Sequence, residues 1–232
     1  MAPKKNNKRV SNNRRTLIAS LDSKSPISEQ YRTIRTNIQF SSVDNDIQTL
    51  MVTSSGPSEG KSTTVANLAV VFAQQGKKVL LVDADMRKPT VHYTFNLTNV
   101  HGLTSVLTRQ MTLIDAMTGI TENNLFVLPS GPIPPNPSEL ISSRAMDAFF
   151  REARDLFDVI LFDTPPVLAV TDAQLLANKC DGTVLVVSSG KTEKEQLLKA
   201  KDLLDSAQSK LLGVVLNNKK LENTNYYYYY GN

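Results

Sequence analysis

The chain has 232 residues with a formal net charge of +4, and 41% of its residues are hydrophobic, enough for one large core or two small ones. Its single cysteine, Cys180, excludes an internal disulfide framework and is typical of a reducing cytoplasm. No apolar run approaches the roughly 20 residues of a membrane span, and no apolar segment follows the basic N-terminus as in a secretory signal. The composition therefore predicts a cytoplasmic protein without a membrane span of its own.

Residues 1–24 are predicted to form a flexible basic arm. Six lysines and arginines lie between positions 4 and 15 with no acidic residue among them, and the segment has too few apolar residues for a core. Such an arm can contact nucleic acid or an anionic membrane surface, and it can equally serve only solubility. The net charge does not decide between these roles.

The segment 26–40 is the first predicted helix. Pro26 is a start signal, and apolar residues from Tyr31 to Ile38 recur at helical spacing. The sequence VDND at 43–46 then breaks the pattern.

From residue 49 onward, short apolar runs alternate with helical patterns. Strands that are apolar throughout and separated by helices indicate a parallel sheet covered on both faces. One α/β domain is therefore expected over residues 25–220. Its predicted strands are 49–55, 77–85, 125–131, 158–166, 181–190 and 211–218, and its later helices are 61–76, 143–157, 171–180 and 192–208.

The sequence SSGPSEGKST at 54–63 is the strongest functional signal. A strand runs into a glycine-containing loop that opens a helix, so backbone N–H groups and the helix N-terminus can surround a phosphate. Lys61 can then reach the β- and γ-phosphates, and the Ser62 hydroxyl can bind Mg²⁺. Ser55 stands where the template G-x-x-x-x-G-K-[ST] has its first glycine. The competing interpretation is a chance glycine turn before a helix.

Two further strands end in acidic residues. Asp83 and Asp85 follow the apolar run 79–82, and Asp163 follows the run 159–162. Ligands of open parallel sheets lie at the carboxyl ends of the strands, and Mg²⁺ prefers carboxylate and water ligands. One such aspartate alone could be a helix N-cap, but two strands of this kind beside a phosphate loop indicate a metal and nucleotide site. One carboxylate can hold metal while another accepts a proton.

These motifs resemble a known family. The phosphate loop, VLLVDADMRKP at 79–89 and VILFDTPP at 159–166 resemble the Walker A, Walker A′ and Walker B motifs of the bacterial tyrosine kinases, with a resemblance that covers residues 25–232. The related partition and septum-placement ATPases carry an extra lysine early in the phosphate loop. The stretch Gly56-Pro57-Ser58 has none, which favours the kinase branch. The resemblance implies a P-loop NTPase-like fold with a mostly parallel central sheet, and ATP and Mg²⁺ as cofactors.

The resemblance also implies a role for each matching residue. Lys61 would bind the β- and γ-phosphates, Asp83 would be the base for a tyrosine hydroxyl, and Asp85 and Asp163 would lie near the metal. Metal ligands would come from Ser62, Asp83, Asp85 and Asp163. The nucleotide-binding residues would be Gly56, Pro57, Ser58, Glu59, Gly60, Lys61, Ser62 and Thr63, the last near the α-phosphate, together with Asn217 at the adenine edge.

Three residues near these motifs have open alternatives in the sequence itself. Asn217 can also serve a turn at the end of the last strand. Arg87 and Lys88, which follow the Walker A′ aspartates, can neutralise phosphate charge or form a solvated basic turn.

The predicted helix 26–40 carries the pattern Glu29-x-x-Arg32-x-x-Arg35. Spacing of three places these charges along one helix face, which is ordinarily a solvated face. In the family that this chain resembles, the same pattern makes the subunit contacts of a ring. A ring-shaped homo-oligomer is therefore expected.

The C-terminal segment 221–232 is predicted to be a disordered tail, and it holds five of the seven tyrosines. The resemblance implies an autokinase whose tail enters a neighbour's active site and is phosphorylated there. The expected acceptors are Tyr226, Tyr227, Tyr228, Tyr229 and Tyr230.

The resemblance implies partners and a pathway as well. A membrane-anchored activator protein, protein-tyrosine substrates and a tyrosine phosphatase are expected, but no sequence-specific nucleic acid. The protein would lie at the inner face of the cell membrane and regulate capsular or extracellular polysaccharide synthesis and export. The alternatives are a partition-type ATPase switch without protein kinase activity and a P-loop kinase for a small molecule.

Overall fold

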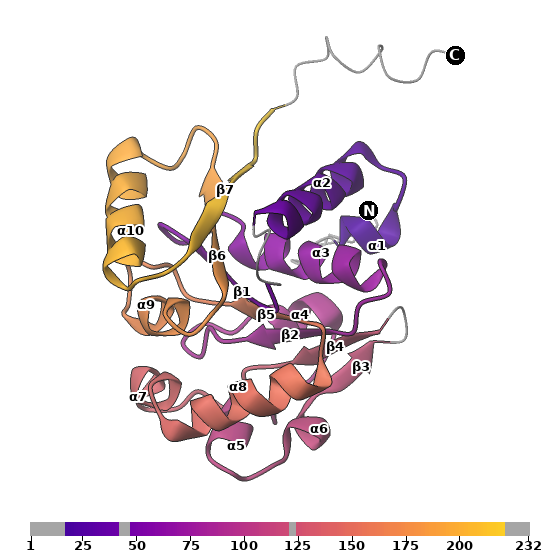
Figure 1. The fold of residues 1–232 in the computed structure, drawn as a ribbon, viewed down its shortest axis with the longest axis vertical. Coiled ribbons are helices and arrows are strands. Elements are labelled where there is room, and N and C mark those ends of the chain that lie inside the picture. The colour runs from indigo at the N-terminus through magenta and orange to yellow at the C-terminus, as the bar shows by residue number, and fades with distance from the viewer. Residues whose placement is uncertain (1–16, 42–46, 121–123, 221–232) are drawn as a thin grey trace, which may run out of the picture.

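A computed structural model describes residues 17–41, 47–120 and 124–220 (Figure 1). Seven strands in these residues form one sheet in the order β3-β4-β2-β5-β1-β6-β7, parallel except for β3. The strands are β1 (Thr49–Ser54), β2 (Val79–Asp83), β3 (Thr118–Ile120), β4 (Leu125–Leu128), β5 (Val159–Asp163), β6 (Gly182–Ser188) and β7 (Leu211–Asn217). The α/β class with a mostly parallel sheet is confirmed.

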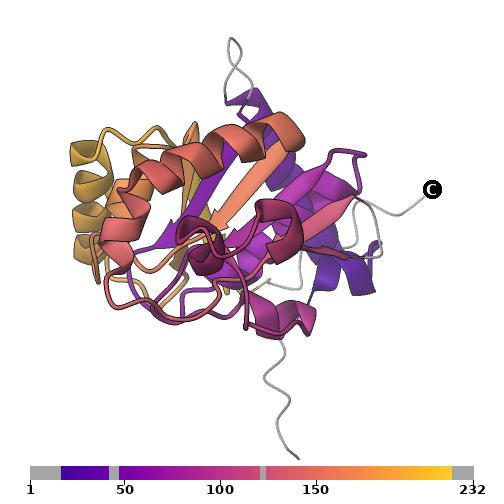
Figure 2. The same cartoon turned by 90° about the horizontal axis from the view of Figure 1, so that it is seen from below.

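Helices cover both faces of the sheet, as Figures 1 and 2 show. One apolar core packs α1 to α4 against one face, and a second core packs α5 to α10 against the other. The helices are α1 (Ile18–Leu21), α2 (Pro26–Phe40), α3 (Lys61–Ala73), α4 (Val91–Phe95), α5 (Leu103–Leu107), α6 (Leu113–Ala116), α7 (Pro137–Ile141), α8 (Arg144–Leu156), α9 (Asp172–Ala177) and α10 (Lys194–Ser206).

Side-chain alternation along β5 explains why its sequence is apolar throughout. Ile160 and Phe162 enter the core beneath α8, whereas Val159 and Leu161 enter the core beneath α3. Because successive side chains point to opposite faces, a strand with helices on both faces has no solvent side. The same holds for β1 and β2, so three neighbouring strands can carry polar residues only at their ends.

Helix α2 has the bounds that the sequence predicts. Pro26 occupies its first turn, where its missing N–H costs nothing, and the Ser25 side chain accepts a hydrogen bond from Ser28 N at 3.2 Å. Tyr31 and Ile34 pack against the α3 side of the core together with the buried Ile38. The amphipathic pattern therefore identified the buried face correctly.

The structure adds a seventh strand to the six that the sequence predicts. β3 has three residues, none fully buried, and pairs antiparallel with β4 at the sheet edge. Four short helices, α4 to α7, also lie between β2 and α8. None exceeds five residues, and such elements are too short to show a helical period.

Helix α1 departs from the expectation of a flexible arm over residues 1–24. Ala19 is fully buried, and its N–H donates to Asn67 Oδ1 of α3 at 3.0 Å. Gln74, the C-cap residue of α3, donates to the Ala19 carbonyl at 2.9 Å. Residues 18–21 therefore pack on the domain, whereas the predicted basic stretch before them lies outside the described residues, as do the break at 43–46 and the tail 221–232.

Replacing Ala19 by aspartate tests this packing. The buried site cannot solvate a carboxylate, so we expect Ala19→Asp to lower the free energy of unfolding by about 1–3 kcal/mol in denaturant titration. The matched change Leu21→Asp lies on the same helix at 75% exposure and should alter it by less than about 0.5 kcal/mol. Equal effects at both positions would contradict a packed α1.

Candidate active site

The three sequence motifs meet at one edge of the sheet. The phosphate loop follows β1, and the acidic residues end β2 and β5, which are neighbours in the order β2-β5-β1. Asp83 and Asp163 are register partners in the β2–β5 pair. The carboxyl ends of parallel strands share an edge, so residues 80 positions apart in the chain face a single site.

The phosphate loop uses two residues in the left-handed backbone region. Ser58 has φ 62° and Gly60 has φ 100°, and Gly60 directly precedes the first residue of α3. A Cβ built on Gly60 would lie 2.0 Å from Asn217 Nδ2, so this position needs glycine for space as well as for conformation. Ser55, where the template has glycine, has an ordinary negative φ, so the departure costs no backbone strain.

Glu59 braces the loop from inside. Its side chain is buried, with Oε2 accepting from Ser55 N at 3.0 Å and Oε1 accepting from the Thr192 hydroxyl at 2.7 Å. Asn217 donates from Nδ2 to the Glu59 carbonyl at 2.9 Å. Lys191 Nζ lies 3.3 Å from the Pro57 carbonyl. Among the predicted nucleotide-binding residues, Glu59 and Asn217 therefore hold the shape of the loop.

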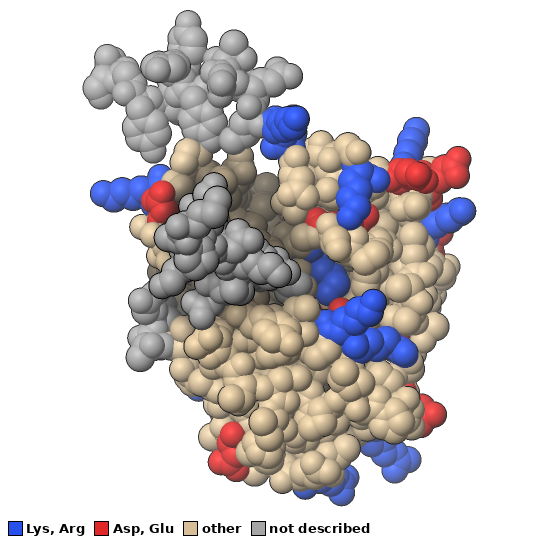
Figure 3. All heavy atoms as spheres, turned by 180° about the vertical axis from the view of Figure 1, so that it is seen from behind, with Lys and Arg blue, Asp and Glu red and all other residues tan. Residues whose placement is uncertain are grey.

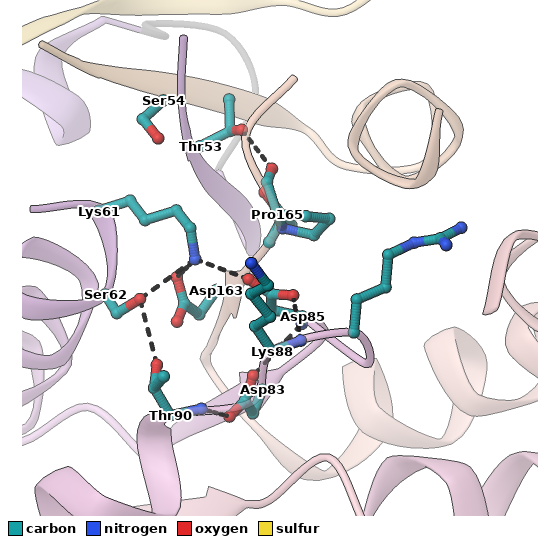
Figure 4. Close-up of polar contacts among 12 residues, drawn as sticks. Thr53, Ser54, Lys61, Ser62, Asp83, Asp85, Lys88, Thr90, Asp163 and Pro165 are labelled. Atoms are coloured by element: carbon teal, nitrogen blue, oxygen red, sulfur yellow. Dashed lines mark hydrogen bonds and ion pairs between the residues drawn. The ribbon is translucent and has the colours of Figure 1, made fainter. Parts of the chain in front are cut away.

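Lys61 bridges the two acidic strand ends. Its Nζ lies 3.0 Å from Asp85 Oδ2, 3.3 Å from Asp163 Oδ1 and 3.2 Å from Ser62 Oγ (Figure 4). Burial acts to lower the pKa of Lys61, but the charges of Asp163 and Asp85 outweigh it and raise that pKa. Lys61 is therefore a largely buried ammonium, with 12% of its side chain exposed, held by two carboxylates.

Asp83 is fully buried and surrounded by backbone donors. Its Oδ2 accepts from Thr90 N and Val91 N, both at 2.9 Å, and its Oδ1 accepts from Asp85 N at 3.2 Å. Burial and the nearby charge of Asp163 nevertheless raise the pKa of Asp83 to about 7. Its carboxyl therefore changes protonation near neutral pH.

The two carboxylate oxygens of Asp85 contact two different partners. Oδ2 faces Lys61, and Oδ1 accepts from Lys88 N at 3.0 Å. Thr90, which the motifs do not include, lies at the opposite side of the cluster, with its hydroxyl 3.5 Å from Ser62 Oγ. No sequence signal identifies Thr90, because α4, which follows it, is too short to show a helical period.

The donor set suits Mg²⁺. The hydroxyl of Ser62 and the carboxylates of Asp83, Asp85 and Asp163 gather around Lys61 (Figure 4), and Mg²⁺ takes hard oxygen ligands while keeping several waters or phosphate oxygens. Over residues 17–41, 47–120 and 124–220, no three His, Cys, Asp or Glu side chains form a cation cage by themselves. An ion here would share its coordination with water and a nucleotide.

The basic side chains of Lys61 and Arg87 pair with different carboxylates. Figure 3 shows lysine and arginine side chains in and beside a hollow on the face opposite to that of Figure 1. Arg87, however, is turned onto Asp172, with Nε 2.8 Å from Oδ2 and Nη2 3.0 Å from Oδ1. The sequence suggested phosphate neutralisation or a solvated turn for Arg87, and the structure instead places it in an ion pair with a buried carboxylate.

The three charges predicted for a subunit contact lie on α2 and outside this cluster. Arg32 pairs with Glu29 and donates from Nη2 to the Ser23 carbonyl at 2.6 Å. Arg35 donates from Nη1 to the Val71 carbonyl of α3 at 2.7 Å. Both arginines therefore also make contacts within the chain. The predicted acceptors Tyr226 to Tyr230 lie outside the described residues.

A phosphate loop lies between a strand and a helix, and its lysine faces aspartates at the ends of two neighbouring strands. This combination defines a P-loop nucleotide-binding protein. The AAA domain family model matches residues 47–210. The chain is 58% identical over 231 residues to the tyrosine-protein kinase YwqD of Bacillus subtilis, covering 100% of this chain and 97% of that protein.

Solved structures agree with this relationship. The chimerical protein CapA2B2 superposes with a TM-score of 0.86 at 48% identity, covering 88% of this chain and 90% of that one. The kinase domain of the Escherichia coli tyrosine kinase ETK gives a TM-score of 0.85 at 30% identity, covering 94% and 85%. The chain belongs to the bacterial tyrosine kinases of the AAA-domain family, which confirms the predicted family, fold and enzyme class of protein-tyrosine kinase.

The raised pKa of Asp83 predicts a specific dependence of stability on pH. The folded pKa, about 7, lies above the ordinary 3.8, so between about pH 4 and pH 7 the folded protein keeps a proton that the unfolded chain has released. The raised pKa of Asp83 therefore contributes to the free energy of unfolding at the acid end of this range, and this contribution is lost as the pH rises through 7. Asp83→Asn removes this dependence.

We therefore expect the free energy of unfolding of Asp83→Asn, relative to the unmodified protein, to increase between about pH 5 and about pH 8. Denaturant titration in the presence of a chelator measures it. Asp155→Asn, at an exposed position of α8, is the control and should follow the unmodified protein at both pH values. A parallel pH course for Asp83→Asn would show that Asp83 does not titrate in this range.

Proposed function

We propose that this kinase transfers the γ-phosphoryl group of ATP to tyrosines of its own C-terminal cluster, Tyr226 to Tyr230, in a neighbouring subunit. The observation that carries the proposal is Lys61 held between Asp85 and Asp163 at the mouth of the phosphate loop. A phosphoryl group in transfer needs a cation on its oxygens and a base at the attacking hydroxyl. Both kinds of group meet here.

Each residue has a defined task in this reaction. Lys61 binds the β- and γ-phosphate oxygens, and the left-handed residues of the loop aim backbone N–H groups at them. Bound Mg²⁺ would neutralise charge on the same oxygens, held by Ser62 and the carboxylates of Asp85 and Asp163. Phosphate charge would then replace the carboxylate charge that Lys61 now contacts.

Asp83 serves as the base. The tyrosine oxygen attacks the γ-phosphorus. The bond between the γ-phosphorus and the β–γ bridging oxygen breaks to release ADP, and the phenolic proton passes to the Asp83 carboxylate. A general base works best with a pKa near the working pH, and the pKa of Asp83 lies at about 7. The backbone N–H groups of Thr90 and Val91 fix its orientation without using all its lone pairs.

Asn217 and its surroundings support a binding place for the base of the nucleotide. Asn217 lines a groove of about 470 Å³ between α2 and β7, which also includes Tyr31, Ile34 and Thr64. The groove begins beside the phosphate loop, because Asn217 contacts Glu59. Its apolar walls and terminal amide fit the face and edge of adenine.

The start of the tail supports transfer between subunits. β7 ends at Asn217 beside the phosphate loop, and eight residues, 218–225, separate it from Tyr226. Fully extended, they span about 25 Å at roughly 3.3 Å per residue. A linker of this length is long enough for the tail to leave its own subunit and enter the site of a neighbour, and repeated tyrosines tolerate loose positioning.

We propose that the neighbouring subunit belongs to a ring in which Glu29, Arg32 and Arg35 contribute to the subunit contact. Each tail phosphate adds about −1.5 to −2 charges and loosens this ring.

A membrane-anchored activator would hold the kinase at the inner face of the membrane. A tyrosine phosphatase would reset the tail. The cycle would regulate synthesis and export of capsular or extracellular polysaccharide. No helix in the described segments has the length and apolar character to span a bilayer.

The first test locates the tyrosines that become phosphorylated. With γ-labelled ATP and Mg²⁺, we expect phosphotyrosine in the C-terminal peptide by mass spectrometry, and its loss when all five tail tyrosines become phenylalanine. Nucleotide binding by that variant should be unchanged. Lys61→Met should remove the label from the protein that keeps its tail tyrosines.

Label that persists at Tyr31 or Tyr93 in the five-phenylalanine variant would contradict the tail as the acceptor. Released phosphate without any phosphotyrosine would instead favour the partition-type switch.

The second test is the mass of the particle. Arg32→Ala with Arg35→Ala should reduce the mass measured by light scattering to that of smaller species. Because Arg35 also binds the Val71 carbonyl, thermal unfolding must show that the variant remains folded. Lys194→Ala with Lys199→Ala, exposed on α10, is the matched control. An unchanged mass for the folded α2 variant would rule out this contact.

A further inference from the structure

The segment between β2 and α4, residues 84–90, has no regular secondary structure, yet its backbone shapes the active site. The N–H groups of Asp85, Thr90 and Val91 donate to Asp83, and that of Lys88 donates to Asp85. A backbone without helix or strand partners has to be fixed by other contacts. The position of the two carboxylates therefore depends on whatever anchors this segment.

Ala84 and Met86 anchor this segment in the core, and Arg87 is a further anchor that reaches away from the acid cluster. Its guanidinium makes two bonds, of 2.8 and 3.0 Å, to the two oxygens of Asp172. Asp172 is fully buried, and it begins helix α9. Paired geometry of this kind is strong and directional, which lysine cannot reproduce.

Ser138 completes the contact. Its hydroxyl lies 2.7 Å from Asp172 Oδ1 and 3.2 Å from Arg87 Nη2. Ser138 belongs to α7, which lies beside α9 (Figure 1). The three side chains thus join the 84–90 segment to two helices.

We propose that Arg87, Asp172 and Ser138 form a clamp that positions the catalytic carboxylates Asp83 and Asp85, so that Arg87 is a positioning residue and does not bind phosphate. The proposal rests on the site described under Proposed function. A move of the guanidinium to a phosphate would take the only cation from the buried Asp172 carboxylate in the ion pair described here and leave it with the Ser138 hydroxyl. The clamp instead holds the turn so that Lys88 N stays on Asp85.

The energetic consequence lies in coupling between the partners. If the clamp acts as one unit, removing either partner loses the whole effect, and removing both loses no more. If Arg87 binds phosphate, its loss weakens nucleotide binding, whereas Asp172→Asn leaves the arginine free to bind. The two roles therefore give opposite results for Asp172→Asn.

The test uses full-length Arg87→Lys, Asp172→Asn and the double variant. We expect each variant to lower kcat for phosphoryl transfer from ATP about 10-fold or more. The Mg²⁺ concentration needed for half of the maximal activity should rise by a similar factor. Affinity for ADP without Mg²⁺, measured by fluorescence titration, should be unchanged. The double variant should match the more affected single variant.

A readout independent of activity is hydrogen exchange of the peptide covering residues 84–91. It should exchange faster in all three variants, whereas the phosphate-loop peptide should not change. Ser138→Ala should give a smaller effect in the same direction. Arg154→Lys and Asp181→Asn form the control, because they alter an arginine–aspartate pair beside Thr49 at the opposite end of β1.

Two results would overturn the clamp. One is ADP affinity that falls in Arg87→Lys but not in Asp172→Asn, which would assign Arg87 to phosphate. The other is unchanged exchange of residues 84–91 in folded variants, even where activity falls. The self-labelling site plays no part in either readout, so failure of the tail proposal would leave this test intact.

Discussion

The buried charge cluster at the sheet edge is the constraint on which the rest of the structure depends. One ammonium, Lys61, faces Asp85 and Asp163 directly, and the third carboxylate, Asp83, is fully buried beside Asp163. Three carboxylates and one cation cannot all be charged in a low-dielectric site without further support. The excess negative charge is relieved in two ways. Backbone N–H groups donate to Asp83, and the raised pKa of Asp83 keeps its carboxyl protonated up to about pH 7.

The topology brings these groups together. β2, β5 and β1 are neighbours in the sheet although they are separated along the chain by the segments 55–78 and 84–158. Their interiors are apolar on both faces, so charge can be placed only where the strands end. A phosphate entering there meets the ammonium of Lys61, and Mg²⁺ meets the carboxylates, so the cluster offers charges of both signs for phosphoryl transfer.

The sequence predicted what depends on long periodic patterns or on local motifs. Helix α2, the six longer strands and the convergence of Lys61, Asp83, Asp85 and Asp163 belong to this group. It missed β3 and the helices α4 to α6, because three to five residues carry too little periodicity and their stability comes from packing. It also could not assign Arg87, because its partner Asp172 lies 85 residues away and nothing local distinguishes an ion pair from a solvated turn.

The motif residues are held in place by residues outside the motifs. Thr192 and Asn217, from the loop after β6 and from β7, brace the phosphate loop through Glu59. Asp172 and Ser138 hold the acid segment through Arg87. All four supports come from the part of the chain after residue 137, whereas the groups they support lie before residue 91. The site reaches its geometry only when the later part of the chain has packed against the earlier part, so its chemistry depends on the complete domain and not on the Walker motifs alone.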